Sequence, residues 1–188
     1  MIIETGRFGK LTVGEEELIA FPLGIFGFPD LKKFCLVDTG DDTLILWLQS
    51  CDQPNVAFPV LEPKIFKPDY AVRLSGVELR ELQLENVNSS VVFSILTIPD
   101  NVTEMTANLK APIVVNLKNQ IGRQVVLQEN EYSIKTLMFK ELKAHWVTIQ
   151  SSKRAATQSS SEGAGASVNI PVAIKDIPPS LTVKSLQV

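Results

Sequence analysis

The first 143 residues are divided into many short apolar runs separated by turn residues, and this spacing constrains the fold more than any other feature. The runs are rich in Val, Ile, Leu and Phe, which is typical of β-strands. The expected strands are 2–8, 10–13, 17–21, 34–38, 43–50, 56–61, 70–74, 90–98, 112–117, 123–128 and 132–137. Such spacing predicts an all-β, mainly antiparallel, small barrel-like domain rather than a parallel sheet.

One or two short helices are expected beside the strands. Ser75 and Glu78 have the spacing of a capping box, with Ser at the N-cap and Glu at the third helical position, and leucines follow at helical intervals. Segments 30–33 and 135–141 are each long enough for a single helical turn.

The composition changes near residue 150 and divides the chain into three parts. Residues 1–145 form the expected β domain, and 146–167 are a Ser/Ala/Gly-rich stretch whose few apolar residues predict a flexible linker. The tail, 168–188, alternates apolar and polar residues in places, as at 181–186, and predicts short extended segments. One hypothesis is that the tail adds a strand to a partner or to the domain itself.

The charges also differ between the two ends of the chain. The net charge is -3, and the four cations and two acids after residue 143 leave 14 cations against 19 acids before it, a local charge of −5. Binding to a phosphate backbone needs clustered cations, so no direct contact with nucleic acid is expected. An acidic surface is instead suited to a basic protein partner.

The residues that catalysis or metal binding would need are scarce. The chain has two cysteines, Cys35 and Cys51, and one histidine, His145, so it lacks the four ligands of a structural zinc site. Both cysteines lie in apolar runs and are expected to be buried free thiols. Phosphate-binding and nucleophile motifs are absent from the sequence. The sequence therefore predicts a protein that is not an enzyme and that needs no metal or cofactor.

Nothing in the sequence indicates export or membrane insertion. The N-terminus lacks a basic stretch followed by a long apolar one, so no signal peptide is expected. The longest apolar run, 91–98, is far shorter than the ~20 residues of a membrane-spanning helix. A cytoplasmic location without membrane contact follows as the prediction.

The segment 21–28 contains two glycines and three phenylalanines. It lacks the strand-to-helix context of a phosphate-binding loop, so we interpret it as a tight turn in which Gly24 and Gly27 supply unusual dihedral angles. Phe26 and Phe28 are expected to fill the core.

Two further segments have more apolar residues than a solvated loop requires, namely 54–70 and 106–116. Pro59 cannot donate a ladder hydrogen bond, so it marks an edge strand or a bulge, and an edge near aromatic residues is a natural docking site. Phe58 and Phe66 are either anchors for a partner or ordinary core residues, and the sequence leaves both interpretations open.

At this point the sequence resembles the flagellar assembly factor FliW family. The strongest match is 106–116, TANLKAPIVVN, and the order and spacing of all matching stretches extend over about residues 1–140. The other matching stretches are 1–5, 8–9, 21–28, 34, 48–50, 57–58, 68–70, 122–124 and 132–134. The part of the chain after about residue 145 matches no known feature of the family.

The resemblance implies a small non-catalytic β-barrel protein with two polypeptide partners. Proteins of this family bind flagellin, and they also bind CsrA, an RNA-binding repressor of translation. Abundant flagellin occupies the factor and leaves CsrA free to block flagellin translation; once flagellin is exported, the factor binds CsrA and translation resumes. The antagonism of CsrA is described as allosteric rather than as mimicry of RNA.

The residues expected to contact partners come from the two apolar segments. Phe58 and Phe66 would be the anchors, because aromatic residues dominate interface energetics. The asparagines would supply directional hydrogen bonds and the lysine a charge at the rim. The full set is Asn55, Phe58, Pro59, Phe66, Asn108, Lys110 and Pro112. A small-molecule-binding β-barrel is the alternative function, and a secreted structural module is a third class that the N-terminus does not favour.

Overall fold

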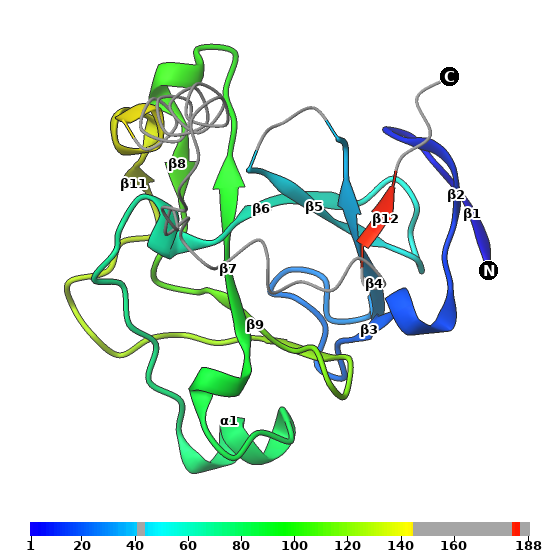
Figure 1. Ribbon diagram of the computed structural model, residues 1–188, viewed down its shortest axis with the longest axis horizontal. Helices are drawn as coiled ribbons and strands as arrows, with labels where there is room; N and C mark the ends of the chain where they lie inside the picture. The colour runs from blue at the N-terminus through cyan, green and yellow to red at the C-terminus, as the bar shows by residue number, and fades with distance from the viewer. Residues whose placement is uncertain (41–43, 145–181, 185–188) are drawn as a thin grey trace, which may run out of the picture.

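The structure is a computed structural model that describes residues 1–40, 44–144 and 182–184. Most of the described chain is short strands joined by turns, with little helix (Figure 1). The strands are β1 (Ile2–Thr5), β2 (Gly9–Thr12), β3 (Ile19–Ala20), β4 (Lys33–Asp38), β5 (Leu46–Ser50), β6 (Ala57–Leu61), β7 (Val91–Thr97), β8 (Thr106–Ala107), β9 (Ile113–Asn116), β10 (Ile121–Gln124), β11 (Thr136–Leu137) and β12 (Thr182–Lys184).

Seven of these strands close into a barrel. The hydrogen-bonded order runs β7-β6-β5-β4-β3-β10-β9, and β9 pairs back to β7, with Val92 opposite Val114. All of these pairings are antiparallel except that of β3 with β10. The predicted fold class, an all-β and mainly antiparallel barrel with short helices, is therefore confirmed.

The helices are short, as expected. Helix α1 (Gly76–Glu81) begins at the predicted capping box: the backbone N–H of Glu78 donates to Ser75 Oγ, and the Ser75 N–H donates to Glu78 Oε2. A second helix begins at residue 139, and the other helical elements are single 3-10 turns. The 3-10 turns are η1 (Glu15–Glu17), η2 (Pro63–Ile65), η3 (Val87–Ser89) and η4 (Val102–Glu104). No described helix has the length and apolarity needed to cross a bilayer.

Some predicted elements are wrong in detail. Residues 70–74 form no strand, and 30–33 form no helical turn. The strand predicted at 123–128 lies earlier in the chain, since β10 is Ile121–Gln124. After Gln124 the chain runs beside the segment before β9, and the N–H groups of Val125 and Leu127 donate to the carbonyls of Pro112 and Lys110. The segment 132–137 forms only a two-residue strand at its end. The predicted linker, 146–167, lies outside the described residues.

The barrel interior is filled by one apolar cluster, and β4 separates it from a second cluster outside the barrel. Phe34 and Leu36 point into the barrel with Phe21, while Cys35 and Val37 pack on the other side beneath the β1–β2 hairpin. This burial on both sides explains the continuous apolar run in the sequence of β4.

Cys35 and Cys51 are free and buried, as predicted. A hydrogen bond with Cys51, together with burial, raises the pKa of the Cys35 thiol, so this thiol stays protonated at neutral pH.

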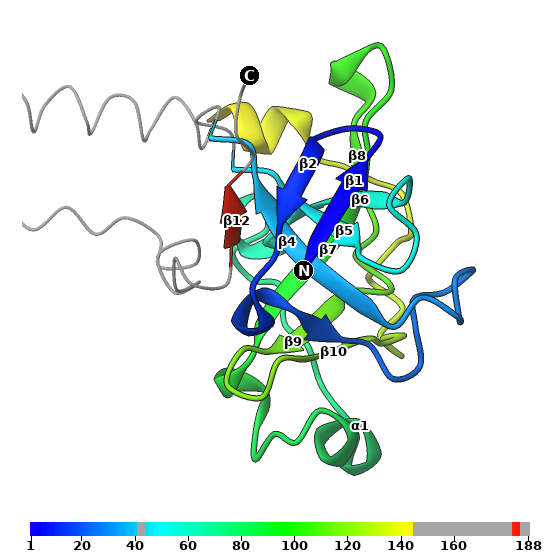
Figure 2. The same cartoon turned by 90° about the vertical axis from the view of Figure 1, so that its right-hand side faces the viewer.

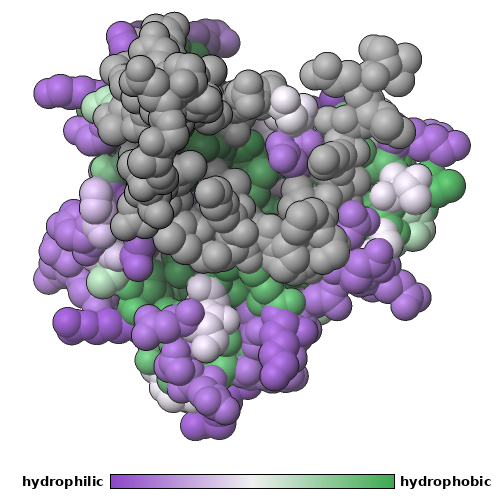
Figure 3. Space-filling model, viewed as in Figure 1, coloured by the Kyte–Doolittle hydropathy of each residue, from purple (hydrophilic) through white to green (hydrophobic). Residues whose placement is uncertain are grey.

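A third cluster covers the outer side of β9 and includes Val114, Leu82 and Phe66. Asn116 joins α1 to this strand, because its Nδ2 donates to the carbonyls of Leu82 and Gln83 at 2.9 and 3.0 Å. In Figure 1 helix α1 lies at the bottom of the molecule, on the side away from the β1–β2 hairpin. Figure 3, in the same view, shows mainly hydrophilic side chains over the lower part of the molecule and hydrophobic ones directly above them.

The 21–28 segment is the tight loop that the sequence predicts, but its phenylalanines are arranged differently. Gly24 and Gly27 have φ angles of 69° and 84°, in the left-handed region that favours glycine. Phe26 and Phe28, predicted to fill the core, remain 58% and 36% exposed. The core positions are taken by Phe21 and Ile25 instead, so the prediction for Phe26 and Phe28 is wrong.

Candidate partner-binding surface

The turn between β5 and β6 presents Asn55 to solvent at one end of the two strands. The turn is internally braced: the N–H of Gln53 donates to Ser50 Oγ at 3.0 Å, and Asp52 Oδ2 accepts from the N–H groups of Lys32 and Lys33. Asn55 is exposed, and its side-chain oxygen lies against Gly6 of the β1–β2 turn, 2.9 Å from where a Cβ would stand. Any larger residue at position 6 would therefore displace Asn55.

Phe58 lies on β6 and is half-buried. Its ring meets Phe34 of the barrel interior at a centroid distance of 6.4 Å and Phe28 of the tight loop at 5.4 Å. Because Phe28 is itself exposed, the Phe28–Phe58 pair links the core to solvent at this end of the barrel. Both of the interpretations that the sequence left open for Phe58, core residue and anchor, are compatible with this position.

Pro59 lies in a strand that is internal to the sheet but locally has an open edge. β6 pairs with β5 from Ala57 to Val60, whereas its ladder with β7 includes only Val60 and Leu61. Among the described strands, β5 is thus the one neighbour of Ala57–Pro59. The predicted edge exists at the level of these residues, and the absent N–H of Pro59 costs no ladder hydrogen bond there.

A hollow of about 450 Å³ opens between this turn, the outer face of β5 and the β1–β2 turn. The guanidinium of Arg7 lies over the ring of Trp47, 3.9 Å from its centroid, and Phe8 packs edge-on against the same ring at 5.8 Å. The lining is Gly6, Arg7, Trp47, Gln49, Pro54, Asn55 and Ala57. We call the side chains around this hollow the turn surface, and its members are Arg7, Trp47, Gln49, Asn55 and Ala57. The Phe28–Phe58 pair lies on the other face of β6, because Phe58 packs against the cluster inside the barrel.

Gln49 lines the hollow, and its side-chain oxygen accepts no hydrogen bond from the described residues. The side chain is 0% exposed, and its Nε2 donates to the carbonyls of Ser50, Pro54 and Val56 at 2.8–3.1 Å. Three carbonyl acceptors fix the orientation of the amide, so Oε1 faces away from them and finds no hydrogen-bond donor among the described residues. A buried acceptor without a donor costs about 1–3 kcal/mol.

The second predicted segment, 106–116, is organised as a large bulge. β8 pairs with Leu96 and Thr97 of β7, and β9 pairs with residues 91–93, so that 108–112 lies opposite Ser94 and Ile95 alone. The N–H of Asn108 donates to the Ile95 carbonyl at 2.9 Å, and the rest of the bulge turns toward residues 125–133.

The side chains of the bulge are used within the molecule. Asn108 Oδ1 accepts from the Ala111 N–H at 2.9 Å, and Lys110 Nζ donates to the Glu129 carbonyl at 2.8 Å. Tyr70 Oη donates to the Leu109 carbonyl at 2.8 Å, and burial raises the pKa of that phenol. Pro112 is buried. These contacts give the strongest sequence match in the chain a structural explanation.

Phe66 is 7% exposed and packs in the cluster outside β9, whereas Phe58 packs against the cluster inside the barrel. The structure therefore does not gather the seven predicted residues into one surface. Asn55, Phe58 and Pro59 lie together, while Phe66 and the bulge belong to the opposite cluster. Sequence reasoning missed Trp47 and Gln49, because only the register shows that they lie on the outer face of β5, and it missed Arg7, because only the fold brings the β1–β2 turn over Trp47.

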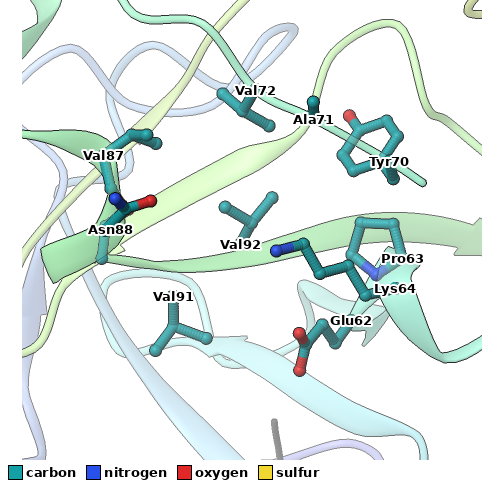
Figure 4. Close-up of a pocket in the computed structure, with 11 residues that line it drawn as sticks. Glu62, Pro63, Lys64, Tyr70, Ala71, Val72, Val87, Asn88, Val91 and Val92 are labelled. Carbon is teal, nitrogen blue, oxygen red and sulfur yellow. The ribbon is translucent and has the colours of Figure 1, made fainter. Parts of the chain in front are cut away.

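A smaller hollow of about 290 Å³ lies near the start of β7 (Figure 4). Tyr70, Ala71 and Val72 stand on one side of it and Val91 and Val92 on another, with polar groups at its margin. Within the described ranges, no group of three or more His, Cys, Asp or Glu side chains could hold a metal ion. The barrel interior is filled by side chains, so the structure gives no support to a ligand site inside the barrel.

Comparison with known proteins gives a consistent result. The family model described as "FliW protein" matches residues 2–138. A flagellar assembly factor FliW from Bdellovibrio bacteriovorus is 46% identical over 142 residues, covering 76% of this chain and 81% of that relative. One from Caldanaerobacter subterraneus subsp. tengcongensis is 42% identical, with 76% and 96% covered. A crystal structure of the flagellar assembly factor FliW matches with a TM-score of 0.70 at 33% identity, covering 74% of this chain and 97% of that one.

Proposed function

The chain belongs to the FliW family of flagellar assembly factors, and from that premise we propose that it binds flagellin and the translational repressor CsrA. Binding to CsrA relieves the repression of flagellin translation, and binding to flagellin withdraws the factor from CsrA. In this proposal the protein acts in the cytoplasm as a protein antagonist without catalytic activity. The observation that carries the proposal is the family match over residues 2–138, which includes every strand of the barrel.

Two features of the molecule support this role. The first 143 residues carry a net charge of −5, which suits a partner that must present cations to RNA. The turn surface combines an arginine stacked on the half-buried ring of Trp47, an exposed asparagine at position 55 and a buried acceptor at Gln49, and the Phe28–Phe58 pair lies at the same end of the barrel. Aromatic and arginine side chains around a polar recess are typical of the centres of protein–protein interfaces.

The decisive experiment measures both partners with the intact chain. Purified full-length protein is titrated calorimetrically with CsrA and, separately, with monomeric flagellin, and each is expected to bind with one-site stoichiometry. In a second assay, CsrA bound to flagellin mRNA is released when the protein is added, and excess flagellin reverses that release. Absence of binding to both partners by a folded protein would contradict the proposal.

A further inference from the structure

Strand β4 has one edge that the barrel leaves partly unpaired. On one side it pairs with β5 from Phe34 to Val37, whereas on the other side β3 pairs only with Lys33 and Phe34. The stretch Leu36–Asp38 on the β3 side is therefore an edge that the seven-stranded barrel does not use. Unpaired strand edges offer a row of backbone donors and acceptors to any extended chain.

The chain's own C-terminal strand occupies this edge. β12 (Thr182–Lys184) pairs in parallel with β4, with Thr182 beside Leu36 and Lys184 beside Asp38. Figure 1 shows β12 over β4, and Figure 2 shows it beside β4 at the left margin of the strands. Of the two alternatives raised for the tail, a strand added to a partner or to the domain, the structure contains the second.

β12 is an addition to the family fold. The family model matches residues 2–138, and the FliW crystal structure is 97% covered by 74% of this chain, so that structure has room for little beyond the barrel. The edge of β4 at Leu36–Asp38 is thus part of the shared fold, whereas the strand that covers it belongs to this chain's extension.

The hold of β12 on that edge is weak by construction. Only three residue pairs form, and parallel pairs are slightly less stable per residue than antiparallel ones. Residues 145–181 separate β12 from Ala144, the last described residue before it, and closing so long a loop has an entropic cost. A strand held in this way can be displaced by a competing extended segment.

We propose that the edge of β4 at Leu36–Asp38 is a strand-docking site for an extended segment of a partner polypeptide, and that β12 competes for it in cis. The fitting segment has alternating apolar and polar residues, as in the chain's own Leu181-Thr182-Val183-Lys184, and it binds mainly through backbone hydrogen bonds. The identity of the partner rests on the proposed function, whereas the docking of a strand does not.

The test uses a fluorescent synthetic peptide of residues 179–188 and the full-length chain. Two variants replace residues of β12 by proline, which has no backbone N–H: Val183→Pro, and the double variant Thr182→Pro/Lys184→Pro. Together they test every backbone donor of β12. The matched control, Ser160→Pro, lies outside β12. A tethered strand has an effective concentration of about 1 mM, so even a strand that docks with millimolar affinity weakens a competitor about 2-fold. The peptide should therefore bind at least about 2-fold more tightly to the variant that removes the β12 donors facing β4 than to wild type or the control. Equal binding to all four proteins, or binding to none, would overturn the proposal.

A locked variant gives the opposite prediction. Asp38→Cys/Lys184→Cys places two cysteines at neighbouring register positions, and oxidation should hold β12 in place. The oxidised protein should bind the peptide at least about 10-fold less than the same protein after reduction, since reduction restores exchange at the edge. Binding that is insensitive to reduction, once the crosslink is verified by mass spectrometry, would contradict β12 as the competitor.

The last arm connects the site to partners. Flagellin and CsrA are titrated against wild type, Val183→Pro and the locked protein, and at least one is expected to bind severalfold more tightly to Val183→Pro and more weakly to the locked form. If both bind all three proteins equally, the edge is not a partner site and the proposal fails. If neither binds any form while the peptide does, the proposed function fails and strand docking stands.

Discussion

The β5–β6 turn and the β8–β9 bulge are both apolar segments that contain a proline and an asparagine, yet their polar groups form hydrogen bonds in opposite ways. In the bulge, Asn108, Lys110 and the Leu109 carbonyl all have partners within the chain. In the turn, Asn55 is exposed and Gln49 keeps an acceptor without a donor. The difference shows that where the hydrogen bonds go, rather than residue type, separates a structural loop from an available surface.

The comparison is tested most strongly in the bulge, where Leu109 is 1% exposed. Leu109→Ala should lower the free energy of unfolding by about 2–5 kcal/mol, because it removes a fully buried side chain and leaves a cavity. Urea denaturation measures the loss. Partner affinity of the folded protein should stay at the wild-type value, and a loss of affinity with wild-type stability would reverse the roles of the two regions.

A matched pair of phenylalanines tests the comparison at a similar scale. Phe58→Ala should weaken binding of CsrA or flagellin by about 2 kcal/mol or more, the scale of an interface hot spot, while the protein remains folded. Phe66→Ala should instead lower stability by about 3–5 kcal/mol and leave the affinity of the folded fraction unchanged, since Phe66 is core. Calorimetric titration and thermal denaturation of both variants separate the two effects. Unfolding of Phe58→Ala, or unchanged affinity, would identify Phe58 as core alone.

The two asparagines offer the same contrast at a smaller scale. Asn108→Ala should lower stability by about 1 kcal/mol, because the Ala111 N–H loses its acceptor, and should leave binding unaffected. Asn55→Ala should change stability by less than about 0.5 kcal/mol, as is usual for exposed positions, and weaken partner binding by about 1 kcal/mol. The same change in both quantities for both variants would remove the distinction between turn and bulge.

The smallest effect is expected at Lys110. Lys110→Met keeps the aliphatic stem but removes the hydrogen bond from Nζ to the Glu129 carbonyl, so stability should fall by about 0.5–1 kcal/mol. Affinity for both partners should not change. If the variant instead loses affinity markedly, and this difference from wild type becomes smaller as salt is added, Lys110 is the rim charge that the sequence suggests.

Local patterns in the sequence predicted much of the fold. The capping box at Ser75 fixes the start of α1 without help from distant residues, and the turn residues between strands fix where each strand ends. The same reasoning failed where distant segments decide. Phe26 and Phe28 are in a loop whose core positions Phe21 and Ile25 fill, which depends on how the loop packs against the barrel.

The candidate surface was predicted only in part for the same reason. Asn55, Phe58 and Pro59 are close in sequence and were recognised together, whereas Arg7 reaches Trp47 only because the β1–β2 hairpin folds over the outer face of β4 and β5. Gln49 reads as an ordinary strand residue until the register shows that its amide is held by three carbonyls. Phe66 and Phe58 look alike in sequence and differ only in the cluster that each joins.

The pairing of β3 with β10 determines when the barrel can close during synthesis of the chain. It joins Ala20 to Ile121, so the ring of strands stays incomplete until the ribosome has released more than half of the chain. Contacts so distant in sequence are typical of slow folding, and an emerging N-terminal fragment has open edges throughout that time. We therefore expect a nascent chain to acquire its binding competence late and in a single step, rather than in stages as synthesis proceeds.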